Sequence, residues 1–193
     1  MEPCSRPSSL PAARRAPPPL DLVQDFVNTE IPEWARDDIG TPSALEAWLR
    51  ARGLLDDDPV DAAAFVRARE LRAALRFLAL GNTLGAPPDD ELRQGAARAL
   101  ARVTLGVTVD EAGAVVPIPV GGGVDRALGV LLSLVLQAQA SGTWQRLKAC
   151  RKETCGWLFY DASRNHSAMW CSMSICGNRA KTASYRRRRA GNS

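Results

Sequence analysis

The chain has 193 residues, of which 46% are hydrophobic and 24% charged, and this composition supplies a core for one domain of moderate size plus a smaller one. No apolar run approaches the ~20 residues that cross a bilayer, and no apolar signal segment comes first, so we expect a cytoplasmic protein without a membrane span. The net charge of +4 is divided unevenly: residues 144–193 carry 11 basic and 2 acidic residues, whereas residues 21–143 carry 11 basic and 18 acidic ones. A basic end of this kind attracts a polyanion, although basic tails are often only solvated.

The first part of the chain is expected to be a disordered leader followed by a short helix. Residues 1–19 hold six of the 13 prolines, with Ser and Arg between them. Apolar residues then recur at helical spacing over residues 20–29, and Pro32 ends this helix. Asn28 and Thr29, at its end, are interpreted as polar groups that are satisfied locally rather than as ligand-facing residues.

Three further helices are expected before the first strands. One covers residues 43–52, and Thr41 supplies the hydroxyl that caps its N-terminus. The next covers residues 60–80, where the acidic run Asp56–Asp58 suits the positive end of the helix dipole. A fourth helix is expected over residues 89–102.

The helix predicted over residues 60–80 carries several arginines outside its apolar stripe. They are Arg67, Arg69, Arg72 and Arg76. A basic ring could hold an acidic ligand, but a solvated face is the simpler interpretation.

The pattern then changes to alternation, which predicts a hairpin over residues 103–120 with its turn at Asp110–Gly113. Pro117 and Pro119 place the second strand at an edge. Residues 124–140 are apolar nearly all round, which indicates the central buried helix of the domain.

Four of the five cysteines form two C-x4-C pairs separated by fifteen residues: Cys150, Cys155, Cys171 and Cys176. Two close pairs can reach one tetrahedral centre, so the spacing favours a four-thiolate zinc site over free thiols, disulfides or an iron–sulfur cluster. His166 could replace one thiolate, but four sulfurs already complete the shell, and we expect this histidine to lie in a solvent-facing loop.

The run Cys176-Gly177-Asn178-Arg179, after the other three cysteines, resembles the CGNR zinc finger family over residues 144–189. Other matching residues are Phe159, Asp161, Ser163-Arg164-Asn165, Trp170-Cys171-Ser172-Met173 and Ala180-Lys181. Members of this family usually carry an upstream domain called ABATE, whose name links it to stress-induced transcription regulation. Residues 20–143 resemble that domain at Asp25–Thr29 and Leu45–Leu49. The chain departs from the family pattern at Ala168 and Met169, where basic residues are common.

The expected fold is therefore α+β and predominantly helical. A disordered leader (1–19) precedes an ABATE-like helical domain with one hairpin (20–143), and a small treble-clef-like zinc finger follows (144–193). Within the finger, residues 157–160 are expected to pair with residues 168–171, and a helix is expected from Cys176 to about Arg188. The cations expected to offset the thiolate charge are Lys148, Arg151, Lys152 and Arg179.

The basic residues of the finger are the candidates for contact with nucleic acid: Arg179, Lys181, Arg186, Arg187, Arg188 and Arg189. Arg179 has a second interpretation, as a residue that holds the zinc module together. Four aromatic residues, Trp157, Phe159, Tyr160 and Trp170, could stack on unpaired bases, but the small core of the finger is the simpler place for them.

The sequence thus predicts a DNA-binding transcription regulator with a structural zinc ion. The N-terminal domain would sense a ligand of unknown identity or form a homodimer. The alternative is an RNA-binding or protein-interaction module with a structural zinc. An enzyme is not expected, because the chain has one histidine and no carboxylate pair or nucleophile–base pattern.

Overall fold

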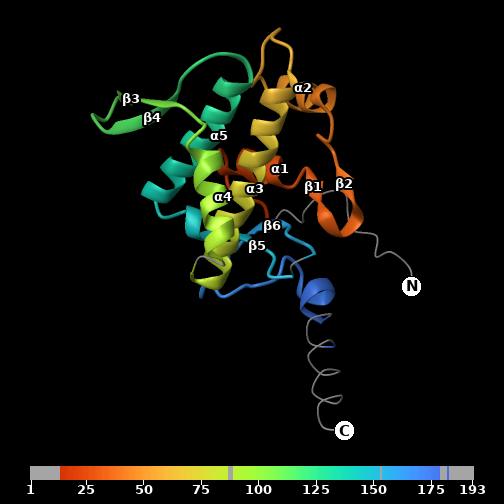
Figure 1. The fold of residues 1–193 in the computed structure, drawn as a ribbon. Helices are drawn as coiled ribbons and strands as arrows, with labels where there is room; N and C mark the ends of the chain where they lie inside the picture. Colours follow the sequence, from red (N-terminus) through yellow and green to blue (C-terminus); the bar gives the residue numbers. More distant parts are fainter. Residues whose placement is uncertain (1–13, 87–88, 153, 179–181, 183–193) are drawn as a thin grey trace.

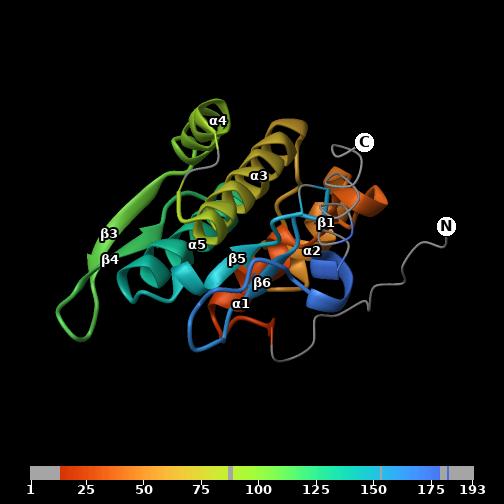
Figure 2. The same cartoon turned by 90° about the horizontal axis from the view of Figure 1, so that it is seen from below.

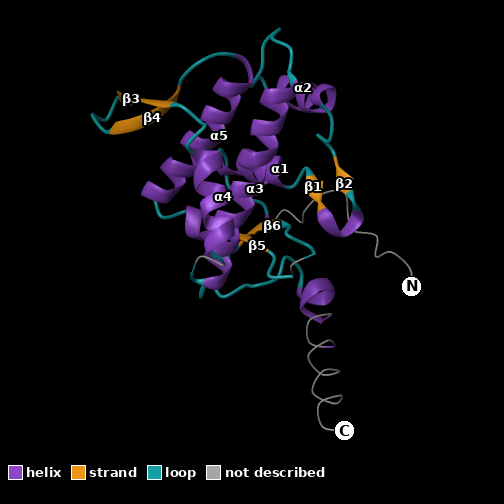
Figure 3. Ribbon diagram, viewed as in Figure 1, coloured by secondary structure: helices purple, strands orange, loops and turns teal. Residues whose placement is uncertain are grey.

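The computed structural model describes residues 14–86, 89–152, 154–178 and 182. Within these residues the α-helices are α1 (Leu20–Val27), α2 (Pro42–Arg50), α3 (Ala62–Leu84), α4 (Asp90–Leu100) and α5 (Gly123–Ala140). Three antiparallel strand pairs join β1 (Glu30–Ile31) to β2 (Arg36–Asp37), β3 (Leu105–Val109) to β4 (Val115–Pro119), and β5 (Leu147–Ala149) to β6 (Leu158–Tyr160). Short helical turns are η2 (Pro32–Trp34), η3 (Trp144–Arg146) and η4 (Met173–Gly177). The predicted α+β fold, mainly helical, is confirmed (Figures 1 and 3).

The main core lies where α1, α3 and α5 pack together. Phe26 of α1, Leu71 and Leu75 of α3, and Leu131 of α5 are all fully buried there. The buried side chains of α5 occur on most of its turns, as the apolar pattern predicts for a central helix. None of the helices in the described part of the chain is long and apolar enough to cross a bilayer.

Side-chain caps mark the beginning of α2, α3 and α4. The Thr41 hydroxyl accepts a hydrogen bond from the Ala44 amide at 3.2 Å, as predicted. The cap of α3 is Asp61, whose carboxylate accepts from the Ala64 amide at 2.6 Å, and not the predicted run Asp56–Asp58, which is exposed in the preceding loop. A cap satisfies an amide two or three residues further along the chain, and Asp61 stands at this distance from the first turn of α3 whereas Asp56–Asp58 do not.

Two of the four arginines predicted for a solvated face of α3 instead form ion pairs with the β1–β2 hairpin, one buried and one half-buried. Arg72 is 1% exposed and holds both carboxylate oxygens of Asp37, at 2.6 and 2.7 Å. Arg76 pairs with Glu30 at 2.5 Å and donates to the Val27 carbonyl. The prediction was wrong for these two residues because their acidic partners come from a distant segment that sequence periodicity does not reveal.

The hairpin of β3 and β4 lies against α5 through β4 and projects beyond the helices (Figures 1 and 2). Its closest approach to α5 is at Gly129, where an added Cβ would lie 2.9 Å from the Pro119 Cβ. The absence of a side chain at Gly129 therefore allows β4 to lie directly on the helix.

The strand pair β5–β6 packs on the same core as the helices. Trp144, Leu147, Ala149 and Leu158 belong to one buried cluster with side chains of α1, α3 and α5. We call residues 20–143 the body and residues 144–178 the finger. The two parts share a continuous apolar interior, although Ser141 and Gly142 do end α5 between them.

Candidate metal centre

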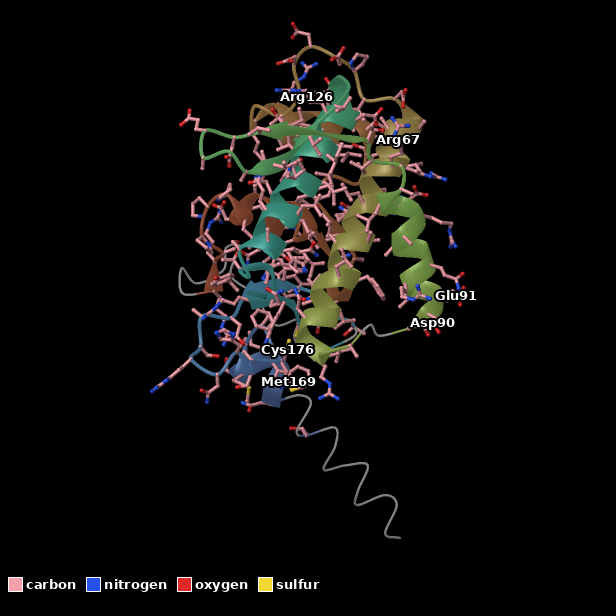
Figure 4. All side chains as sticks on the ribbon, turned by 90° about the vertical axis from the view of Figure 1, so that its left-hand side faces the viewer. Arg67, Asp90, Glu91, Arg126, Met169 and Cys176 are labelled. Carbon is pink, nitrogen blue, oxygen red and sulfur yellow. The ribbon has the colours of Figure 1, made fainter. Side chains whose placement is uncertain are left out.

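The four predicted ligands come together at one end of the molecule. Cys150 follows β5, Cys155 precedes β6, Cys171 lies shortly before η4, and Cys176 lies within η4. All four are buried, and their sulfur atoms lie within 4.8 Å of one another. Figure 4 shows Cys176 and Met169 at this end, with Arg126 at the opposite end of the molecule.

The distances between the sulfurs fit a tetrahedral metal site. The Cys155 and Cys171 sulfurs are 3.8 Å apart, and those of Cys171 and Cys176 are 3.7 Å apart. Four sulfurs at about 2.3 Å from a zinc ion form a tetrahedron with edges of about 3.8 Å. The cluster can therefore hold a metal ion with all four thiolates as ligands.

Backbone turns position each pair of cysteines. The Cys155 amide donates to the Lys152 carbonyl at 2.8 Å, and Gly156 follows with a φ of 55°. This left-handed conformation favours glycine and turns the chain back toward β6. In the second pair, the Cys176 amide donates to the Ser172 carbonyl at 3.0 Å, while the Ser172 hydroxyl accepts from the Ile175 amide at 3.3 Å.

The four thiols strongly shift one another's pKa values. Hydrogen bonds from Cys150, Cys171 and Cys176 hold the pKa of Cys155 far below its usual range. The pKa values of Cys171 and Cys176 are raised, chiefly because each donates to the sulfurs of Cys150 and Cys155. The group cannot ionise fully on its own, because neighbouring thiolates repel, and a divalent cation among the sulfurs would remove this conflict.

The cations predicted to offset the thiolate charge mostly bind other partners. Lys148 pairs with Asp161, Lys152 pairs with Glu33 at 2.5 Å, and Arg151 lies 3.8 Å from the Met169 sulfur. Arg179 lies outside the described residues. The prediction was wrong for both lysines because carboxylates from other segments lie within their reach.

A buried ion pair organises the loop between the two cysteine pairs. The Lys148 ammonium is 2.9 Å from the Asp161 carboxylate and also donates to the carbonyls of His166 and Ala168. Asp161 in turn accepts from the amides of Ser163 and Ala168, at 3.1 and 2.9 Å. Burial opposes ionisation of Asp161, but hydrogen bonds from Ser163, Lys148 and Ala168 outweigh it and lower the pKa to about 2.

This pair is a supporting element that sequence reasoning missed. Asp161 belongs to the family motif, but nothing in the pattern marks it or Lys148 as buried. His166, by contrast, is exposed with a φ of 47°, and it lies outside the cysteine cluster, as predicted.

The strand pairing of the finger differs from the prediction. Strand β6 pairs with β5, in the register Leu147–Tyr160, and not with residues 168–171. A backbone hydrogen bond, from the Arg151 amide to the Met169 carbonyl at 2.9 Å, joins that segment to the chain just after β5. Leu147 and Ala149 face the body core, and their burial outweighs the local pairing that the sequence indicates.

Buried polar side chains of α1 tie the finger to the body. Asn28 accepts from the Leu158 amide at 2.8 Å and donates to the Leu158 carbonyl at 2.9 Å, while Gln24 donates to the same carbonyl at 3.1 Å. The prediction that Asn28 is satisfied locally was wrong, because its side-chain amide matches the exposed backbone edge of β6.

Side chains of α3 and of the segment before α1 complete this interface. Asn82 donates to the carbonyls of Trp144 and Leu147, both at 2.9 Å, and Thr83 donates to the Ala149 carbonyl at 2.6 Å. Arg14, which the sequence places in the leader, donates to the Trp170 carbonyl at 3.0 Å and lies over the Phe159 ring.

The aromatic residues of the finger form core, as predicted. Phe159 is fully buried in a cluster with the four cysteines, and Trp157 and Trp170 pack against that cluster. Tyr160 packs against the main core. The predicted nucleic-acid contacts Arg179, Lys181 and Arg186–Arg189 lie outside the described residues, as does the helix predicted to continue to Arg188.

Two family models match the chain. A model described as "CGNR zinc finger" matches residues 146–189. The ABATE model, described as "Putative stress-induced transcription regulator", matches residues 20–147. No curated protein matches the chain.

Proposed function

Because this chain belongs to the ABATE family and carries a CGNR zinc finger, we propose that it is a transcription regulator whose finger is folded by a structural Zn²⁺ and binds DNA. The single observation that carries the proposal is the cluster of four buried thiols at one end of the molecule. A complete sulfur shell leaves no open position for water, so the metal supplies folding energy rather than catalysis. The proposal accordingly includes no enzymatic activity.

The charge distribution supports DNA as the ligand. The segment that follows the last cysteine, residues 177–193, contains six Lys or Arg and no acidic residue. The body has an excess of acidic residues and would be repelled by a phosphate backbone. We propose that Arg179, Lys181 and Arg186–Arg189 contact phosphates, which gives affinity with little choice of sequence.

The rest of the molecule would act in the cytoplasm as the regulatory part. The body would sense a ligand or form a homodimer, and the shared core would transmit its state to the finger. RNA is the second polyanion to consider, but Phe159 is buried and Trp157 and Trp170 pack around the metal centre. These rings are therefore poorly placed to stack on unpaired bases.

The test measures binding of the zinc-loaded full chain to duplex DNA across a salt series by fluorescence anisotropy. If about six phosphates are neutralised, the log–log slope of affinity against salt should be about −5. The double variant Arg186→Ala with Arg189→Ala should lower the magnitude of this slope by about 2 and weaken binding at every sequence.

A charge-matched control separates the tail from general electrostatics. Arg93→Ala with Arg126→Ala removes the same charge from the body, and Arg126 lies at the end opposite the metal centre (Figure 4). The control should bind DNA as the wild type does. Equal binding by the wild type and the tail variant at all salt concentrations would reject the proposal, and preferential competition by single-stranded RNA would favour the alternative.

A further inference from the structure

The hairpin of β3 and β4 presents one strand that nothing else in the described chain pairs with. We call residues 105–119 the arm. Strand β4 lies on α5, with Pro119 against Gly129, and β3 forms the outer strand. Figures 1 and 2 show the arm extending away from the helices in both views.

The two edges of the arm differ in their ability to form hydrogen bonds. The Asp110 amide donates to the Ala114 carbonyl at 2.9 Å, so this pair is hydrogen-bonded and the pairs Val109–Val115 and Val107–Pro117 are not. In non-hydrogen-bonded pairs the backbone groups point outward, away from the partner strand.

The consequence is an arm with one blocked edge and one open edge. On β4, two of the three outward positions are Pro117 and Pro119, which have no amide proton. On β3, the outward positions are Leu105, Val107 and Val109, each with a donor and an acceptor. A further strand can therefore add to β3 and not to β4.

The face of the arm that meets α5 continues as an exposed apolar surface. Leu105 and Pro119 meet α5 at Gly129, and the same face then presents Val107, Val109 and Val115. These three valines are 73%, 63% and 70% exposed. Three adjacent exposed valines on a two-stranded ribbon indicate an arm that is available for association.

We propose that a second copy of this chain covers the arm, with β3 pairing antiparallel to β3 of the partner around a two-fold axis at Val107. In this register Leu105 lies opposite Val109 of the partner subunit. The outward backbone amides of each β3 therefore meet the outward carbonyls of the other. The result is a four-stranded sheet in which the exposed valines of both copies share one face.

Charge complementarity favours a second copy as the occupant. The arm has Glu111 at its tip and Arg102 just before its base, and both are exposed. Because the two arms run antiparallel, the tip of each arm, with Glu111, lies near the base of the other, where Arg102 stands. Arg102 is 2.9 Å from Glu70 in its own chain and remains 56% exposed, which leaves its guanidinium accessible to a second carboxylate.

This inference rests on the homodimer of the proposed function and gives it an interface. Self-association is measured without DNA, so its failure would leave DNA binding standing. Sedimentation equilibrium of the zinc-loaded full chain should show a monomer–dimer equilibrium. Val107→Pro removes one outward amide and one exposed valine side chain, and neither takes part in pairing with β4, so the hairpin should stay intact. The dimer should weaken at least about thirtyfold, because two symmetric hydrogen bonds are lost.

The matched control is Val115→Pro, which makes the same substitution on the same face but at the edge that is already blocked. It should dimerise as the wild type does, apart from the small loss of one valine side chain. A wild type that stays monomeric up to roughly 100 μM, or equal dimerisation of the two proline variants and the wild type, would overturn the proposal.

A charge exchange gives a second measurement that does not alter the backbone. Glu111→Arg and Arg102→Glu should each weaken the dimer several-fold, and the double variant should restore it. Additive weakening in the double variant would reject the register.

Discussion

At the scale of single residues, the finger depends on a lysine and an aspartate that were not evident as a pair. Lys148 and Asp161 have side chains that are only 5% and 2% exposed, and each satisfies further backbone groups of the loop 161–168. Breaking a buried pair by removing one partner leaves an uncompensated charge, which costs several kcal/mol. The pair therefore stabilises the loop that carries the chain from Cys155 to Cys171.

We predict that Asp161→Asn destabilises the protein by at least about 2 kcal/mol, the value that corresponds to lowering the pKa from 3.8 to about 2. The stability that comes from this lowered pKa is fully present above the unfolded value of 3.8. It is lost as the pH falls toward 2. The loss of unfolding free energy caused by Asp161→Asn should therefore be constant from about pH 5 to 8, and denaturant unfolding with zinc present would measure it. A penalty that changed across this interval would contradict the assignment.

In the body, Arg72 likewise forms a buried ion pair that joins segments far apart in the sequence. Its guanidinium holds Asp37 through two hydrogen bonds and donates to Thr29 at 3.0 Å, so it joins α3 to β2 and to the end of α1. The pKa of Asp37 is lowered chiefly by this hydrogen bonding. A bidentate pair fixes orientation as well as distance, which explains how a two-residue strand such as β2 keeps its place.

At the scale of elements, the contact between α5 and β4 sets the direction of the arm. Helix α5 presents Gly129 to Pro119, and an added Cβ would be 2.9 Å from a side-chain atom and 3.1 Å from the backbone Cα of Pro119. Proline is rigid, so the strand cannot give way locally. The whole arm would have to shift.

We predict that Gly129→Ala lowers the unfolding free energy by about 1–2 kcal/mol, because overpacking outweighs the gain in helix propensity. Thermal unfolding should show a Tm lower by roughly 2–8 °C. The control is Gly95→Ala in α4, where the nearest atom to the added Cβ is Arg98 Nη2 at 3.9 Å. The Gly95→Ala variant should be slightly more stable than the wild type. A Gly129→Ala protein as stable as this control would show that α5 and β4 are not tightly packed at Pro119.

At the scale of the whole molecule, the finger is part of the folded body rather than a separately tethered unit. Hydrogen bonds from Asn28, Asn82 and Thr83 reach backbone groups of the finger, and the main core extends across the junction. The orientation of the metal centre relative to the helices is therefore fixed by buried contacts. A change in the body can therefore reach the finger through these buried contacts.

We predict that removing zinc with a chelator destabilises the body together with the finger and lowers the Tm by roughly 10 °C or more. Hydrogen exchange should become faster at the Leu158 amide and in the last turns of α3, which contact the finger. The arm and α2, which lie at the other end of the molecule in Figure 1, serve as internal controls and should change less. Unchanged exchange in α3 would show that the two parts are energetically independent.

Much of this protein follows from local sequence. Apolar periodicity located helices α1–α5 and the β3–β4 hairpin to within a few residues. It could do so because the spacing of apolar side chains along the chain shows which face of an element is buried. The four cysteines were also identifiable, because a tetrahedral thiolate site needs close pairs on two turns. Local chemistry likewise explains Thr41 as a cap and Gly156 as the turn after Cys155.

Only the tertiary structure decided which distant groups meet. Lys148 was assigned to the thiolates and binds Asp161, Arg72 was assigned to solvent and binds Asp37, and Asn28 was assigned to its own helix and binds Leu158. The physical reason is that periodicity reports whether a side chain faces inward, whereas a buried polar partner depends on where two remote segments cross. The sequence determined the helices, the hairpin and the metal ligands, and the crossing of α1 and α3 with β5 and β6 determined how the finger is held.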